Sequence, residues 1–120
     1  MKKLSSADGQ AADHVIITDK HGIIEYVNPA FEKLTGFSLR EAVGHIPRLV
    51  KSTHHPPEFF RNLWMSILAG GVFRAEFINQ KKNGELYRVE KTITPIKDEH
   101  GRITHFVSVG RSSHSRPAIN

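Results

Sequence analysis

Short apolar runs separated by a turn organise the first part of the chain. Residues 15–17 and 23–27 are two apolar, mostly β-branched runs, and residues 19–22 read Asp-Lys-His-Gly between them. Apolar runs of this length on either side of a glycine-containing turn are typical of a β-hairpin. The pattern therefore predicts two antiparallel strands, with ordered structure beginning near His14.

Two short helices are predicted directly after this hairpin. Asn28 and Pro29 are favoured residues for the N-cap and the first helical position, and Gly36 supplies a stop. Ser38 and Glu41 have the spacing of a capping box, in which each side chain bonds the other residue's backbone amide. A second helix should therefore start at once after the first one ends.

A longer amphipathic helix is predicted over residues 56–69. Its apolar side chains recur at the spacing of one helical face, and two consecutive glycines end the pattern. Three strands follow, at residues 72–80, 85–97 and 102–109, separated by turn-forming residues. An order of two strands, helices and then three strands has no βαβ alternation, so it predicts an α+β fold.

The third predicted strand indicates which face of the sheet is buried. One of its faces carries Phe73, Ala75, Phe77 and Asn79, and the other carries Arg74, Glu76 and Gln80. An antiparallel sheet with one apolar face is covered by helices on that side only. Asn79 is the polar exception on the face that we expect to be covered.

Length and composition describe one folded domain. The chain has 120 residues, of which 38% are hydrophobic and 24% charged, which suits a single globular domain. We expect an N-terminal arm or short helix at residues 1–13, the domain at 14–111 and a disordered tail at 112–120. No apolar run approaches the roughly 20 residues of a membrane span, and the N-terminus lacks a signal-peptide core. We therefore expect a cytoplasmic location.

Composition also limits the chemistry. The sequence contains no cysteine, which excludes disulfides, thiolate metal sites, iron–sulfur clusters and a flavin–cysteinyl adduct. The net charge of +5 is scattered, as in the neighbouring Glu90 and Lys91, so we expect no direct nucleic-acid contact. No nucleophile elbow, phosphate-binding loop or zinc-protease motif occurs, so we expect no enzyme activity. His54 and His55 suggest a solvated loop rather than a metal site.

Several short motifs in one order resemble the PAS domain family over roughly residues 12–111. They are ITD at 17–19, NPAF at 28–31, TGF at 35–37, EAVG at 41–44, KKNGELY at 81–87, PI at 95–96 and DEHG at 98–101. The resemblance implies a five-stranded antiparallel sheet in the order 2-1-5-4-3, helices on one face, and a cavity between the sheet and the long helix. It further implies a sensory domain of a bacterial-type signalling protein, such as a histidine kinase, a diguanylate cyclase, a chemoreceptor or a transcription regulator.

The resemblance leaves the ligand of that cavity open. The candidate lining residues are Trp64, Phe77, Asn79, Asn28 and Phe31. Similarity to the flavin redox sensors of nitrogen-fixation regulators continues without gaps through a long middle section, and it makes an FAD-binding redox sensor one alternative. An isoalloxazine ring needs an apolar slot, for which Trp64 and Phe77 are candidates, and an amide such as that of Asn79. The chain departs from the flavin-binding patterns at Ile16, Pro47, Phe73, Ala75 and Val89.

Two other readings of the cavity remain. In the first, the cavity binds a metabolite. In the second, side chains fill the cavity and the domain is a ligand-free dimerisation module. Haem is not expected, because His54 and His55 precede the long helix and the helix itself contains no histidine. The expected partner is a second copy or an adjacent signalling domain, contacted through the outer face of the sheet and the N-terminal arm.

Overall fold

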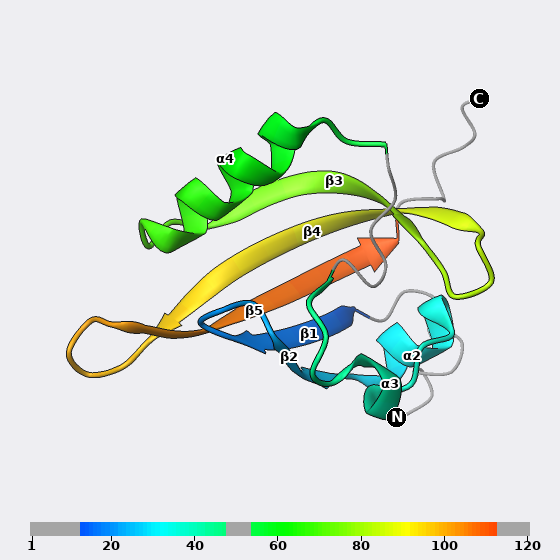
Figure 1. Cartoon of the computed structure of the whole chain (residues 1–120), viewed down its shortest axis with the longest axis horizontal. Coiled ribbons are helices and arrows are strands. Elements are labelled where there is room, and N and C mark those ends of the chain that lie inside the picture. The colour runs from blue at the N-terminus through cyan, green and yellow to red at the C-terminus, as the bar shows by residue number, and fades with distance from the viewer. Residues whose placement is uncertain (1–12, 48–53, 113–120) are drawn as a thin grey trace.

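The structure is a computed structural model, and it describes residues 13–47 and 54–112. In chain order the elements are β1 (His14–Asp19), β2 (Ile24–Val27), α2 (Pro29–Thr35), α3 (Leu39–Ala42), α4 (Pro57–Leu68), β3 (Phe73–Gln80), β4 (Leu86–Lys97) and β5 (Ile103–Ser112) (Figure 1). Each strand and helix expected from the sequence is present. Apart from Asp13 and Ser112, the predicted arm and tail lie outside the described residues.

All five strands form one antiparallel sheet in the order β2-β1-β5-β4-β3. The predicted strand order is therefore confirmed. Helix α4 lies along β3 and contacts β3 and β4, whereas α2 and α3 lie by β1 and β2 at the other end of the fold (Figure 1). The two groups of helices leave the middle of the inner sheet face between them.

The apolar core is divided in the same way. One cluster lies under α2 and α3 and consists of Ile16, Ile24, Val27, Phe31 and Ala42. The second lies under α4 and consists of Leu63, Ile67, Phe77, Val89 and Phe106. Each group of helices thus covers its own cluster of apolar side chains.

Asn28 fixes the passage from the hairpin into α2. Its Oδ1 accepts hydrogen bonds from the backbone amides of Phe31 and Val15, each at 3.0 Å, and its Nδ2 donates to the carbonyl oxygen of Asp13 at 2.9 Å. The first bond is the predicted N-cap, and the other two hold the start of β1. Both ends of the Asn28 amide therefore bond to the backbone.

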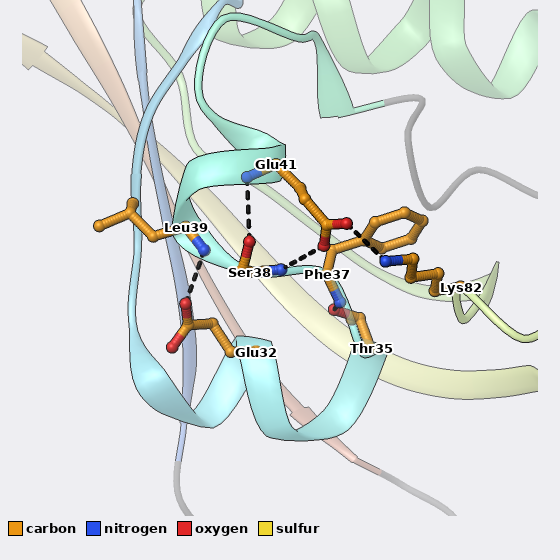
Figure 2. A network of polar contacts seen from close by, with 7 residues as sticks. All are labelled: Glu32, Thr35, Phe37, Ser38, Leu39, Glu41 and Lys82. Atoms are coloured by element: carbon orange, nitrogen blue, oxygen red, sulfur yellow. Dashed lines mark hydrogen bonds and ion pairs between the residues drawn. The ribbon is translucent and has the colours of Figure 1, made fainter.

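The capping box predicted for α3 is also present, and its glutamate contacts the turn between β3 and β4. Ser38 Oγ accepts from the Glu41 amide at 3.1 Å, and Glu41 Oε1 accepts from the Ser38 amide at 2.9 Å (Figure 2). The second Glu41 oxygen pairs with the Lys82 ammonium, and the Lys82 amide donates to the Thr35 carbonyl at 2.8 Å. The Lys82 bond and the Ser38 amide lower the pKa of Glu41 below its usual range. These bonds tie α2 and α3 to the turn between β3 and β4.

Candidate ligand cavity

A cavity of about 420 Å³ lies between α4 and the inner face of the sheet. The helix contributes Phe60, Leu63, Trp64 and Ile67; the strands contribute Ile16, Thr18, Phe77, Asn79, Lys91, Ile93, Phe106 and Ser108; the connecting segments contribute His21, Gly22, Ile46 and Pro47. Small-molecule sites commonly measure about 300 to 1,000 Å³ and are mostly apolar with a few polar groups. This cavity meets both conditions.

The spacing of residues along each element produces this lining. On α4 the four lining residues are separated by three, one and three positions, so they lie on a single helical face. On β3 and β4 the lining residues are two positions apart, because alternate side chains of a strand face the same side. The lining residues thus follow the helical spacing on α4 and the two-residue spacing on the strands.

Trp64 forms a wall of the cavity and also reaches its outer edge. Its ring meets that of Phe106 edge to face, with centroids 6.0 Å apart and an interplanar angle of 88°. The indole also lies against Gly22 in the turn between β1 and β2. Trp64 is 37% exposed, so one side of the ring faces the cavity while another is open to solvent.

Several polar side chains are buried on this otherwise apolar face. Asn79 is only 4% exposed and hydrogen-bonds with Tyr87, the residue opposite it on β4. Burial raises the pKa of Tyr87 to about 12, and the smaller effect of the Asn79 bond opposes that rise. Ser108 is also buried, and its hydroxyl oxygen has no hydrogen-bond partner within the described part of the chain. Buried polar groups are normally satisfied, so such a hydroxyl suggests a missing partner.

Lys91 is the charged member of the lining, and the sequence analysis did not identify it. The residue is 8% exposed, and its Nζ lies 4.9 Å from the centroid of the Phe77 ring. No carboxylate of residues 13–47 or 54–112 pairs with it, and burial lowers the pKa of its ammonium to about 8. The sequence could have indicated its burial, since Lys91 lies two residues from Val89 and from Ile93 and therefore shares their face of the strand.

The structure separates the five residues predicted to line the cavity into two groups. Trp64, Phe77 and Asn79 lie together around it. Phe31 instead belongs to the apolar cluster under α2 and α3, and Asn28 bonds the backbone at the start of α2. Neither of these two is among the lining residues.

His55 lies outside the cavity, but it is held in place. Its Nε2 accepts a hydrogen bond from the Ile78 backbone amide at 2.9 Å, and its ring stacks on Phe59 at a centroid distance of 4.1 Å. His55 lies in the loop before α4, as expected, but its ring is not fully solvated, because contacts with Phe59 of α4 and with the distant strand β3 bury part of it. Burial, followed by the charge of His54, lowers the pKa of His55.

Within the described ranges, no three histidine, cysteine or acidic side chains are grouped closely enough to hold a metal ion. None of the helices in those ranges is long and apolar enough to cross a membrane.

Comparison with known proteins gives concordant matches. A sequence profile described as the PAS domain matches residues 12–112. The chain is 35% identical over 102 residues to a nitrogen fixation regulatory protein of Klebsiella oxytoca, a match that covers 85% of this chain and 21% of that protein. It is 34% identical over 97 residues to a blue-light-activated histidine kinase of Brucella canis, covering 78% of this chain and 20% of that protein. The chain thus spans about a fifth of the length of these curated relatives.

A solved structure has the same architecture. An RNA-binding light-oxygen-voltage receptor superposes with a TM-score of 0.82 at 24% identity, over 94% of this chain and 33% of that chain. At this level of identity, the likeness concerns the fold.

Proposed function

The chain belongs to the PAS domain family, and from that premise we propose that it is a sensory domain whose cavity binds a small molecule and whose outer sheet face passes the signal to a partner protein. The proposed setting is a signal-transduction protein, in keeping with relatives named as a histidine kinase and a nitrogen fixation regulator. Binding rather than turnover is the proposed activity, since no lining residue carries a carboxylate.

The cavity carries this proposal. A space of about 420 Å³ beside a buried ammonium and an unpartnered buried hydroxyl is poorly explained as ordinary core. Native interiors are closely packed, and their buried polar groups are normally paired. A bound small molecule would fill the space and provide the missing partners. A core that only mediates dimerisation needs neither the volume nor the polar groups.

The outer face of the sheet is the proposed contact surface. Val15, Ile17, Tyr26, Val107 and Val109 lie next to one another across β2, β1 and β5, and we call them the outer-face patch. Tyr26 is 39% exposed and Val109 is 37% exposed. Contiguous exposed apolar side chains often mark protein interaction surfaces. The proposed partner is a second copy or an adjacent signalling domain.

Strand β5 links the cavity to this patch. Ser108 lines the cavity, while its chain neighbours Val107 and Val109 belong to the outer-face patch. Successive side chains of a strand point to opposite faces, so a ligand that shifts β5 also shifts the patch. A signal results if the ligand binds one arrangement of the sheet more tightly than another.

FAD, or another flavin, is the second candidate ligand. Three lining residues suit such a cofactor: the aromatic rings of Trp64 and Phe77 offer an apolar surface for its ring system, and the buried Asn79 offers an amide for its polar edge. When bound, a flavin supplies reversible oxidation and reduction. The chain's own residues would exclude water from the ring and position its polar edge. Photochemistry through a cysteinyl adduct is excluded, because the chain contains no cysteine.

The test begins with the absorption spectrum of freshly purified, untagged protein. The protein is then denatured, and the released supernatant is analysed by mass spectrometry against a mock purification. A stoichiometric small molecule supports the sensory proposal, and flavin bands identify the redox alternative. If nothing is released, and thermal denaturation shows no stabilisation by added flavin or by a metabolite collection, the domain is a ligand-free interaction module.

A further inference from the structure

Lys91 is a buried cation that has no anionic partner among the described residues. It lines the cavity, it is 8% exposed, and no acidic side chain of residues 13–47 or 54–112 pairs with its ammonium. Burying an unpaired charge away from water is strongly unfavourable, and proteins normally pair such a charge. The Phe77 ring, whose centroid is 4.9 Å from Nζ, attracts the ammonium through a cation–π interaction. This interaction replaces only part of the lost hydration and supplies no counter-charge.

The groups around Lys91 do not supply a counter-charge either. His14 and Lys91 both pair with Gly110 in the sheet, from its two sides, so the glycine separates them. A side chain at Gly110 would collide with Val89, since its Cβ would lie 2.7 Å from Val89 Cγ2. Burial, followed by the nearby Lys91 charge, lowers the pKa of His14, and the charge of Asp13 opposes this effect.

Ser108, whose hydroxyl has no hydrogen-bond partner within the described residues, lies diagonally across the β4–β5 pair from Lys91. Ser108 pairs with Ile93 on β4, and Ile93 is two residues along that strand from Lys91. Ser108 and Lys91 both line the cavity. Diagonal neighbours of this kind on one sheet face lie within reach of one bound group. An ammonium and a hydroxyl together are suitable donors for a carboxylate or another small anion.

We propose that the cavity selects a small molecule with an apolar body and one anionic group, that Lys91 binds this group, and that Ser108 donates a hydrogen bond to it. The apolar body would lie against Phe60, Leu63, Trp64 and Ile67 of α4, on the wall opposite the sheet, and against Phe106 of β5. This inference rests on the proposed function, because it specifies the charge of the ligand that the sensory cavity takes.

The test uses probes that differ only in charge. Four acids, benzoate, phenylacetate, indole-3-acetate and hexanoate, are compared with their primary amides by thermal denaturation of the whole chain. Titration calorimetry then follows the pairs that shift the melting temperature. The proteins are wild type, Lys91→Met, which keeps an apolar stem of similar length, and Lys33→Met, which removes an exposed lysine from α2 as a control.

The expected result is that at least one acid binds wild type and Lys33→Met more tightly than its amide does. Lys91→Met should weaken the binding of that acid by about tenfold or more and leave the binding of the amide almost unchanged, since a hydrogen bond to a charged group is stronger than a neutral one. Lys91→Gln replaces the methionine variant in the comparison if Lys91→Met does not fold.

Other outcomes overturn the inference. Equal binding of acids and amides, an acid preference that survives in Lys91→Met, or no binding of any acid each reject it. If an amide or added flavin binds while no acid is preferred, the sensory proposal stands and only the anionic ligand is rejected. If no acid, amide or flavin binds and nothing is released on denaturation, both proposals are rejected.

Discussion

A Cβ atom added to Gly22 would lie 2.9 Å from Cη2 of Trp64. The two residues come from the β1–β2 turn and from α4, and their contact closes one side of the cavity. Gly22 also has a φ of +88°, which residues with a side chain rarely adopt. Both the conformation of the turn and the position of the Trp64 indole therefore require a residue without a side chain at position 22.

We expect Gly22→Ala to lower the free energy of unfolding by more than a matched glycine substitution does. Gly101→Ala is the control, because Gly101 has a φ of +80° and nothing within 4 Å of its added Cβ. The control should cost about 1 kcal/mol from backbone strain alone, and Gly22→Ala about 2 kcal/mol or more. The fluorescence of Trp64, the single tryptophan, should change only in Gly22→Ala. Equal losses and an unchanged spectrum would contradict the contact.

Replacement of Lys91 should make the free energy of unfolding vary less with pH in the alkaline range. Burial lowers the pKa of Lys91 from 10.5 to about 8, so between these pH values the unfolded chain holds a proton that the folded chain has released. The stability of wild type should therefore rise with pH across this window, by on the order of 3 kcal/mol relative to Lys91→Met. Near pH 7 we expect Lys91→Met to be the more stable protein, because it lacks a buried unpaired charge.

Urea denaturation of both proteins at intervals from pH 7 to 10 measures this difference. The comparison between variants is needed, because burial raises the pKa of Tyr87 to about 12 and works in the opposite direction above pH 10. A stability difference between the two proteins that stays constant across the pH series would show that Lys91 is charged and well solvated throughout.

His55 should make the fold sensitive to acid. Its Nε2 must be unprotonated to accept the Ile78 amide, and the pKa of His55 in the folded state lies below 6.5. The unfolded chain therefore takes up the proton first, and stability is lost as the pH falls from about 6.5 through the folded-state pKa. Buried His14 contributes with the same sign, so His55 carries only part of the effect.

His55→Gln replaces the Nε2 acceptor with an amide oxygen and removes the titrating group. We expect its urea midpoint to change less than that of wild type between pH 7.5 and 5.5. His45→Gln, at an exposed position, should follow the wild-type dependence. If His55→Gln loses as much stability in acid as wild type does, the Ile78 bond does not depend on the protonation of His55.

A charge placed in the outer-face patch should weaken self-association. Val109 lies in this patch, next to Val15 on β1, and the carboxylate introduced by Val109→Glu would have to be desolvated in an interface. Analytical ultracentrifugation of Val109→Glu should show a dimer dissociation constant about tenfold or more above that of wild type. Leu86→Glu is the control, because Leu86 is 44% exposed at the start of β4, outside the patch. A monomeric wild type, or equal weakening in both variants, would rule out this patch as the contact between copies.

Local signals in the sequence were enough to predict the secondary structure. Asn28 is followed directly by Pro29, and Ser38 precedes Glu41 by three residues, so the start of each short helix depends on neighbours along the chain. The strands and α4 were equally predictable, because their apolar residues repeat with periods of two and 3.6. The strand order required the family resemblance, since strand pairing joins segments that are far apart in the sequence.

The sequence by itself determined the elements, the α+β class, the absence of cysteine chemistry and the inward direction of Trp64, Phe77 and Asn79. Only the tertiary structure decided which inward-facing residues border a cavity and which fill the core, as Phe31 does under α2. It also showed that Lys91 has no acidic partner within the described ranges and that His55 binds the edge of β3. The physical reason is that burial and pairing depend on neighbours brought together across the sheet, whereas caps and periodicity depend on neighbours along the chain.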